Sequence, residues 1–248
     1  MLILKSASEI ECLRAAGRIA AEVLKKVSEA VKPGVKTSEL DRFAVSLMEK
    51  AGAVSAFKGY RGYPANICIS LNEEVVHGIP SARKIKKGDI VSLDVGVIKD
   101  GFFGDVAGSF PAGAVSREAE MLLRVARECL ADSIAQVKPD ARMGDVAYAV
   151  QSKAEANGYS VVRDFTGHGI GRSLHEDLQV PNYGKPGTGV RLVEGMTFCI
   201  EPMINAGVSN VVVGDDGWTV TTKDKKLSAH VEAAVAVVKG GVDVLTAL

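Results

Sequence analysis

The sequence lacks an excess of charge of either sign. Its 248 residues include 30 basic and 30 acidic side chains, so the formal net charge is zero. A nucleic-acid or anionic-membrane partner would call for a basic surplus, and the composition provides none. Long apolar runs are lacking too: the longest, such as residues 233–238, have the length of a strand and fall far short of a membrane span. We therefore expect neither nucleic acid nor a membrane as a partner.

Cysteine is scarce as well. Cys12, Cys68, Cys129 and Cys199 share no C-x-x-C spacing, so the usual zinc or redox motif of that kind is excluded. The N-terminal stretch LILKSASEIECLRAAG carries charges where a secretory signal would be apolar. We expect a cytoplasmic protein with reduced thiols.

What the chain does have is enough apolar material for a core. Apolar residues make up 47% of it, which suits one large domain or two small ones. Residues 8–31 show apolar side chains at helical spacing, with Ser8 as the expected N-cap. A second helix is expected over 37–50, and the same succession of two helices with Pro and Gly stops returns over 116–158.

Strand patterns follow the helices in each half. They are IVSLDVGVI and FFGDVAGSF in the first half, and MTFCIEPMI, SNVVV, WTVTT and AHVEAAVAVV in the second. Each half, about 8–115 and 116–240, thus predicts two helices and a curved antiparallel sheet. No long Ser/Pro linker separates the halves, so we expect an α+β fold whose sheets merge into a single domain over 1–248.

The two halves also place acids at equivalent points. KKGDIVSLD ends at Asp94 and VEGMTFCIE ends at Glu201, so each acid closes a short apolar run after a glycine. Downstream, Asp105 in GDVAGSF corresponds to Glu232 in VEAAVAV. Chance alternation of helices and strands also yields self-similarity, but here the helical match runs without a gap and the acids coincide. The repeat predicts two related pairs of acids around one polyvalent metal site.

The Asp-Gly dipeptide at 100–101 lies between two apolar runs, which is a strong signal for a two-residue hairpin turn. With that turn, Asp94 faces Ala107 and Asp105 faces Gly96, so the two acids are diagonal neighbours on one face, at most about 7–8 Å apart. Two buried carboxylates this close repel unless one is protonated or both are neutralised. The alternative is an exposed face with two solvated acids; the apolar and glycine neighbours favour a metal.

Histidines extend the expected site. Glu232 interrupts the apolar run AHVEAAVAVV, where an acid is costly unless it is paired or coordinated. His168 and His175 lie in the Gly-rich segment TGHGIGRSLHED, although a lone histidine is more often structural than a ligand. His77 and His175 have similar sequence surroundings and are expected to be symmetry mates, which leaves His168 unpaired. Four carboxylates and one imidazole suit Mn, Fe(II), Co or Zn, and two ions fit four acids better than one.

In this order, HGIP, SLDVGVIKDGFFGD, TGHGIGRSLHED, GMTFCIEP and SAHVEAAV resemble the motifs of type I methionine aminopeptidases. The resemblance covers nearly the whole chain and implies the pita-bread fold, with a dinuclear metal site between two pseudo-symmetric halves. It implies the ligands Asp94, Asp105, His168, Glu201 and Glu232, with Asp105 and Glu232 bridging. It also implies a catalytic domain alone, without the family's N-terminal zinc-binding segment or the type II insertion.

The activity that the resemblance implies is removal of the N-terminal methionine from nascent proteins and peptides with a small second residue, by a monomer with a transient ribosome contact. Two divalent ions would activate a water molecule and polarise the scissile carbonyl. Glu201 would shuttle the proton, while His175 and His77 would hydrogen-bond the substrate. The residues expected to bind the methionine side chain are Tyr60, Tyr63, Cys68 and Trp218, with Phe57 and Leu174 at the edge.

Three positions differ from the pattern that the resemblance leads us to expect. Leu174 stands where an aromatic side chain is expected, Gly96 where threonine is common, and Ala233 where a histidine often follows the bridging acid. These differences concern pocket shape, metal affinity and turnover rate, and they leave the ligand set intact.

Three other functions share part of this evidence. A proline-specific peptidase of the aminopeptidase P or prolidase type resembles the chain in its ligands but carries a large extra N-terminal domain. A pita-bread binding module that has lost catalysis typically lacks several ligands, and all five are present here. A structural metal protein would not need histidines beyond the ligands. We therefore expect a metallo-exopeptidase.

Overall fold

A computed structural model describes residues 2–247. The helices are α1 (Ala7–Glu29), α2 (Thr37–Lys50), the short 3-10 helix η1 (Tyr60–Gly62), α3 (Arg117–Ile134) and α4 (Met143–Ala156). The strands are β1 (Val54–Ser55), β2 (Cys68–Leu71), β3 (Glu74–Val76), β4 (Ile90–Lys99), β5 (Phe102–Pro111), β6 (Ser160–Val161), β7 (Gly167–Gly169), β8 (Glu176–Val180), β9 (Thr197–Ile200), β10 (Met203–Asn205), β11 (Val211–Val213), β12 (Val220–Thr222), β13 (Ser228–His230), β14 (Ala233–Val238) and β15 (Gly241–Val244). Over residues 2–247, the helices are too short or too polar to cross a membrane.

The helices begin and end close to where the sequence predicts them. α2 spans the expected residues 37–50, and α3 and α4 repeat the pattern in the second half. The expected N-cap of α1 is wrong, because the cap is Ser6 and Ser8 lies inside the first turn. The Ser6 hydroxyl accepts a hydrogen bond from the Glu9 amide, and the Glu9 carboxylate accepts one from the Ser6 amide at 3.1 Å, which is a capping box.

Strands β4 and β5 form the predicted hairpin. Asp94 pairs with Ala107, and Gly96 pairs with Asp105. Both turn residues, at 100–101, have positive φ angles of 50° and 78°, as a type I′ turn requires. The prediction of this register is confirmed.

Four hydrogen-bonded sheets are present among the described residues. β5, β4, β2 and β1 form one; the others are β13-β10-β6, β11-β12-β3 and β15-β14-β9-β7-β8. A long two-stranded ribbon runs through two of these sheets, because β9 leads into β10 and β13 into β14 with one continuous register. Each side of the ribbon is interrupted. One interruption is at Glu201-Pro202, where the sequence predicts a strand end, and the other is at Val231-Glu232, inside a run that predicts one unbroken strand.

Strand β5 connects this ribbon to the first half. The Glu232 amide donates to the Ala107 carbonyl at 2.9 Å. The Ser109 hydroxyl donates to the His230 carbonyl at 2.8 Å and accepts from the His230 amide at 2.9 Å. These hydrogen bonds place Glu232 of the ribbon beside β5, the strand of the hairpin that carries Asp105.

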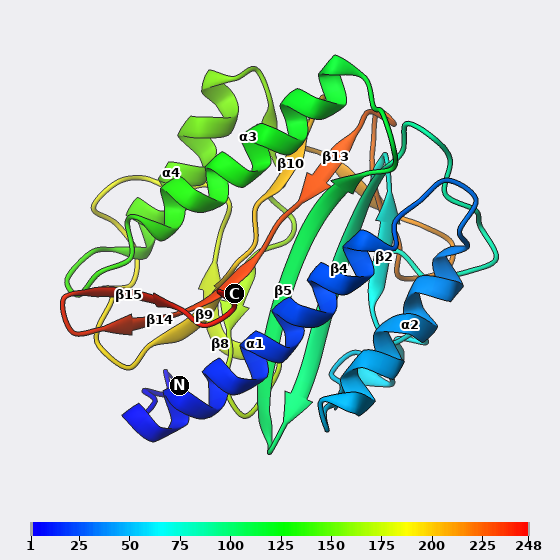
Figure 1. The fold of residues 1–248 in the computed structure, drawn as a ribbon. Coiled ribbons are helices and arrows are strands. Elements are labelled where there is room, and N and C mark those ends of the chain that lie inside the picture. Colours follow the sequence, from blue (N-terminus) through cyan, green and yellow to red (C-terminus); the bar gives the residue numbers. More distant parts are fainter. Residues whose placement is uncertain (1, 248) are drawn as a thin grey trace.

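The helices cover one face of the hairpin (Figure 1), where α1 runs across β4 and β5 with α2 beside it, while α3 and α4 lie over the second half. The odd-numbered β4 residues from 91 to 97 pack in the core with α1 and α2. Because side chains alternate along a strand, the Asp94 side chain and the Cα position of Gly96 belong to the opposite face. That face, away from the helices, carries the site.

Candidate functional site

The five expected ligands come from separate strands and meet in one place. Asp94 lies on β4, Asp105 on β5 and His168 on β7, while Glu201 and Glu232 occupy the two interruptions of the ribbon. His168 Nε2 lies 3.8 Å from Asp105 Oδ2 and 3.6 Å from Glu201 Oε1. Donor atoms of Asp105, His168 and Glu232 all lie within 4.8 Å of one another. This spacing is suitable for ligands that surround a cation.

The four acids are poorly accommodated as bare carboxylates. Burial raises the pKa of Asp94 to about 7. Burial, and then repulsion from neighbouring acids, raises the pKa values of Asp105, Glu201 and Glu232 well above their usual range. Asp94 Oδ1, Asp105 Oδ1 and Glu232 Oε1 are buried and have no hydrogen-bond partner. Since buried polar atoms nearly always have partners, these oxygens fit the binding of a cation.

His168 is held in the form that binds a metal. Its Nδ1 lies 3.0 Å from the Gly169 carbonyl oxygen, which can only accept a hydrogen bond. Nδ1 therefore carries the proton and Nε2 keeps its lone pair, on the side of Asp105 and Glu201. Burial lowers the pKa of His168 to about 4, so the ring is neutral at pH 7.

His175 lies beside the expected ligands. Its ring centroid is 3.9 Å from that of His168, and it stacks on the Tyr60 ring at 5.3 Å. His175 Nδ1 lies 2.9 Å from the Tyr60 hydroxyl oxygen. Burial lowers the pKa of His175 to about 3, so the imidazole is neutral at pH 7. With the hydroxyl donating to Nδ1, Nε2 carries the proton and can donate it to a substrate.

His77 follows β3 directly and has an unusual backbone. Its φ of 61° is in the left-handed region, which is uncommon for a residue other than glycine. Its ring meets Trp218 edge-on, with centroids 6.3 Å apart, and Phe165 at 5.7 Å. Backbone strain of this kind persists only where the surrounding structure enforces it.

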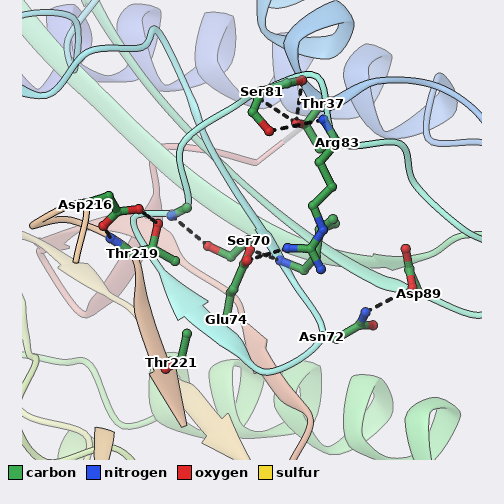
Figure 2. Close-up of polar contacts among 12 residues, drawn as sticks. Thr37, Ser70, Asn72, Glu74, Ser81, Arg83, Asp89, Asp216, Thr219 and Thr221 are labelled. Atoms are coloured by element: carbon green, nitrogen blue, oxygen red, sulfur yellow. Dashed lines mark hydrogen bonds and ion pairs between the residues drawn. The ribbon is translucent and has the colours of Figure 1, made fainter. Parts of the chain in front are cut away.

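Polar contacts hold the chain before and after His77, and Figure 2 shows those of Ser70, Glu74 with Arg83, and Thr37 with Ser81. The Ser70 hydroxyl accepts from the amide of the next residue along, Gly78, at 3.1 Å. The Glu74 carboxylate accepts a hydrogen bond from the Arg83 guanidinium at 2.5 Å, which links the two ends of the segment 74–83 that contains His77. The Thr37 hydroxyl accepts from the Ser81 amide at 2.8 Å and ties the same segment to α2.

A cavity of about 130 Å³ opens at this site. Its lining includes every residue that the sequence predicts for metal, catalysis or substrate, and adds Arg61. The lining residues are Phe57, Tyr60, Arg61, Tyr63, Cys68, His77, Asp94, Asp105, His168, Leu174, His175, Glu201, Trp218 and Glu232. The lining combines the four carboxylates with a cluster of apolar side chains that pack together, Phe57, Tyr63, Cys68 and Leu174 with Tyr60 and Trp218 against them, so the cavity has a charged and an apolar part.

Sequence reasoning missed three residues here. Arg61 has a positive φ of 48° and lines the cavity. His230 is buried with Nε2 unpaired, 4.0 Å from Glu201 Oε2, and Cys199 Sγ belongs to the cluster of donor atoms within 4.8 Å. His230 and Cys199 each precede an expected ligand by two positions. Because side chains two positions apart on a strand lie on the same face, the positions of Glu201 and Glu232 could have indicated both residues.

Comparisons with known proteins bear on this geometry. The chain matches metallopeptidase family M24 over residues 11–239. A methionine aminopeptidase of Clostridium perfringens is 49% identical over 99% of this chain and 99% of its own. The crystal structure of methionine aminopeptidase from Rickettsia prowazekii superposes with a TM-score of 0.98 at 43% identity, covering 100% of both chains. Prolidase from Pyrococcus furiosus gives a TM-score of 0.78 at 20% identity over 99% of this chain and 66% of its own, a likeness of fold alone.

Proposed function

The chain belongs to metallopeptidase family M24, among its methionine aminopeptidases, and from this premise we propose that Asp94, Asp105, His168, Glu201 and Glu232 hold the two divalent ions of the reaction. The reaction is hydrolysis that removes the N-terminal methionine from proteins and peptides. The expected pita-bread fold is confirmed by the same comparisons. For the proline-specific alternative, the comparison with prolidase from Pyrococcus furiosus supports a likeness of fold alone, at 20% identity.

One observation carries the assignment of the ligands. Three buried carboxylate oxygens, of Asp94, Asp105 and Glu232, have no hydrogen-bond partner, and their residues line one cavity with His168, whose Nε2 is free to bind a metal. Bound divalent ions lower the pKa of a water molecule and polarise the scissile carbonyl. Carboxylates and one imidazole suit Mn, Fe(II), Co or Zn alike, so the donor set does not select among them.

Glu201 is the residue we assign to proton transfer. Its Oε1 lies 3.6 Å from His168 Nε2 and its Oε2 lies 4.0 Å from His230 Nε2, so it stands at the edge of the donor cluster. A carboxylate in this place takes the proton of the attacking water and passes it to the departing amine. Burial and neighbouring acids, which raise the pKa of Glu201, favour its protonated form between the two transfers.

His175 and His77 act on the substrate rather than on the ions. His175 Nε2 is the donor left free by the Tyr60 contact, and it is suited to hydrogen-bond the scissile carbonyl oxygen as negative charge develops. His77, fixed between Trp218 and Phe165, is suited to contact the scissile amide. Burial lowers the pKa of both imidazoles, so both rings are neutral at pH 7 and do not repel the bound cations.

The apolar half of the cavity receives the methionine side chain. The Tyr63 and Trp218 rings meet edge to face at 5.1 Å, and the Tyr63 hydroxyl donates to the Gly78 carbonyl at 2.9 Å, which fixes its ring. Cys68 packs with Tyr63 and Leu174 in the same cluster. Contacts between a thioether sulfur and aromatic rings contribute about 0.3–1.5 kcal/mol each, which favours methionine.

We also propose that residues 1–248 form one catalytic domain of two related halves, about 8–115 and 116–240, of which Met1 and Leu248 lie outside the described residues. The hydrogen bonds from β5 to the ribbon support this. We further propose a monomer in the cytoplasm that contacts the ribosome transiently. The cysteines, all within the described residues and all free, are in keeping with a reducing compartment.

Peptide hydrolysis tests the proposal. Protein supplied with Mn, Co or Fe(II) should release methionine from Met-Ala-Ser and spare Met-Leu-Ser, because the second residue must be small. Asp105→Ala should abolish turnover while the circular dichroism spectrum is kept. No release with any of the three metals would reject the function, and an active Asp105→Ala variant would reject the bridging role of Asp105.

A further inference from the structure

The absence of a side chain at Gly96, on β4, is explained by a neighbouring side chain and not by the backbone conformation of Gly96. Its φ is not in the left-handed region, so any residue could adopt this conformation. A Cβ at this position would lie 2.4 Å from Phe57 Cε1, 2.8 Å from Cζ and 2.9 Å from Cδ1. The Phe57 ring therefore occupies the space that a side chain at position 96 would fill.

The ring lies against the metal-site face of the strand. Gly96 falls between Asp94 and Ile98 on the face that points away from the helices, and it pairs with Asp105 on β5. Phe57 is only 7% exposed and lines the same cavity as both acids. It therefore forms a wall of the cavity next to the expected ligands.

The backbone around Phe57 is fixed on two sides. The Ala56 amide donates to the Gly96 carbonyl at 2.9 Å, which ties this segment to β4. The Phe57 amide donates to the Ser55 hydroxyl at 3.1 Å, and that hydroxyl donates to the Asn66 carbonyl at 2.8 Å. With its backbone held, the ring can relieve a clash at position 96 by turning about its side-chain bonds, and the cavity that it lines offers open space for that movement.

We propose that Gly96 and Phe57 act as a pair that sets the side-chain specificity of the enzyme. The missing side chain at 96 lets the Phe57 ring lie flat on β4, and the ring then limits the width of the pocket for the N-terminal side chain. An unbranched thioether fits beside this wall, whereas an aromatic side chain does not. The proposal rests on the proposed function, which supplies the substrate.

The test compares Gly96→Ala, Phe57→Ala and the double variant on Met-Ala-Ser and Phe-Ala-Ser. Gly96→Ala should raise KM for Met-Ala-Ser by about tenfold or more with little change in kcat, because one methyl group displaces the ring into the pocket. Phe57→Ala should raise kcat/KM for Phe-Ala-Ser relative to Met-Ala-Ser by about tenfold. Adding Phe57→Ala to Gly96→Ala should bring KM for Met-Ala-Ser to that of Phe57→Ala alone, below that of Gly96→Ala, because the group that clashes is gone.

Gly108→Ala is the matched control. A Cβ there would also meet an aromatic ring, at 2.9 Å from Phe110 Cζ, but on the helix-covered face of β5. It should affect stability and leave KM unchanged, and bound metal measured in every variant separates pocket effects from metal loss.

An unaltered KM in Gly96→Ala, a double variant no better than Gly96→Ala, or an unaltered substrate ratio in Phe57→Ala would overturn the proposal. If Gly96→Ala does not fold, the substrate ratio of Phe57→Ala decides alone. A wild-type protein that leaves Met-Ala-Ser intact would instead reject the proposed function, and this proposal with it.

Discussion

Removing the divalent ions should make the stability of the folded protein fall as the pH rises from about 4 to about 7. In the metal-free protein, burial raises the pKa of Asp94 from 3.8 to about 7. The folded state then keeps a proton that the unfolded state has lost, so unfolding is favoured as the pH increases through this window. Below pH 4 both states are protonated, and above pH 7 the loss is complete.

The magnitude follows from the difference between the two pKa values. At about 1.4 kcal/mol for each pH unit, Asp94 alone accounts for a loss of about 4 kcal/mol across the window. The raised pKa values of Asp105, Glu201 and Glu232 add to it in the same direction. Bound ions hold these carboxylates in the charged form, so the loaded protein should not show the decline.

Urea unfolding of chelator-treated protein between pH 4 and pH 8, with and without added Mn, measures this effect. Asp94→Asn should make the metal-free decline smaller by about 4 kcal/mol or more, because it removes the titration of Asp94 and also its repulsion of Asp105, Glu201 and Glu232. Asp215→Asn, at an exposed position, is the matched control and should leave the decline unchanged. A metal-free protein whose stability is constant or rises over the window would refute the reasoning, as would an equal decline with the metal present.

Two further predictions concern catalysis and packing. His175→Ala should lower kcat by about 10²- to 10³-fold and keep the metal content of the wild type, because the ring donates to the substrate; loss of metal would make His175 a ligand instead. Gly104→Ala should lower the free energy of unfolding by about 1–3 kcal/mol, because its Cβ would lie 2.4 Å from the Ala16 carbonyl carbon of α1. An unchanged urea midpoint for Gly104→Ala would contradict this close approach of helix and sheet.

The hairpin register could be predicted from the sequence because it depends on local chemistry. An Asp-Gly pair at 100–101 accepts the two positive φ angles of a type I′ turn, and the turn length then fixes every pair along β4 and β5. The diagonal relation of Asp94 and Asp105 follows from that turn alone.

The start of α1 could not be predicted to the residue, because two serines each precede a glutamate by three positions. The N-cap is Ser6, and the residue before it, Lys5, is held by contacts that are distant in sequence. The Lys5 amide donates to the Gly195 carbonyl at 2.7 Å, and its ammonium pairs with Glu176 at 2.6 Å. Neither partner is adjacent in sequence, so no local pattern could reveal them.

The interruption at Glu232 also escaped prediction, because the apolar run continues through this position. At Glu201 the apolar run ends and Pro202 removes a backbone donor from the ribbon, so the strand end there could be expected. The space above Gly96 is similarly invisible in the sequence, since it depends on where the Phe57 ring is packed. Such features arise from tertiary packing rather than from local preference.

Anomalous diffraction from crystals of this protein grown with Mn²⁺ tests the central claim most directly. We expect two peaks, both enclosed by Asp94, Asp105, His168, Glu201 and Glu232, and the loss of both in Asp105→Ala. No peak at these residues, or peaks elsewhere in the molecule, would contradict it.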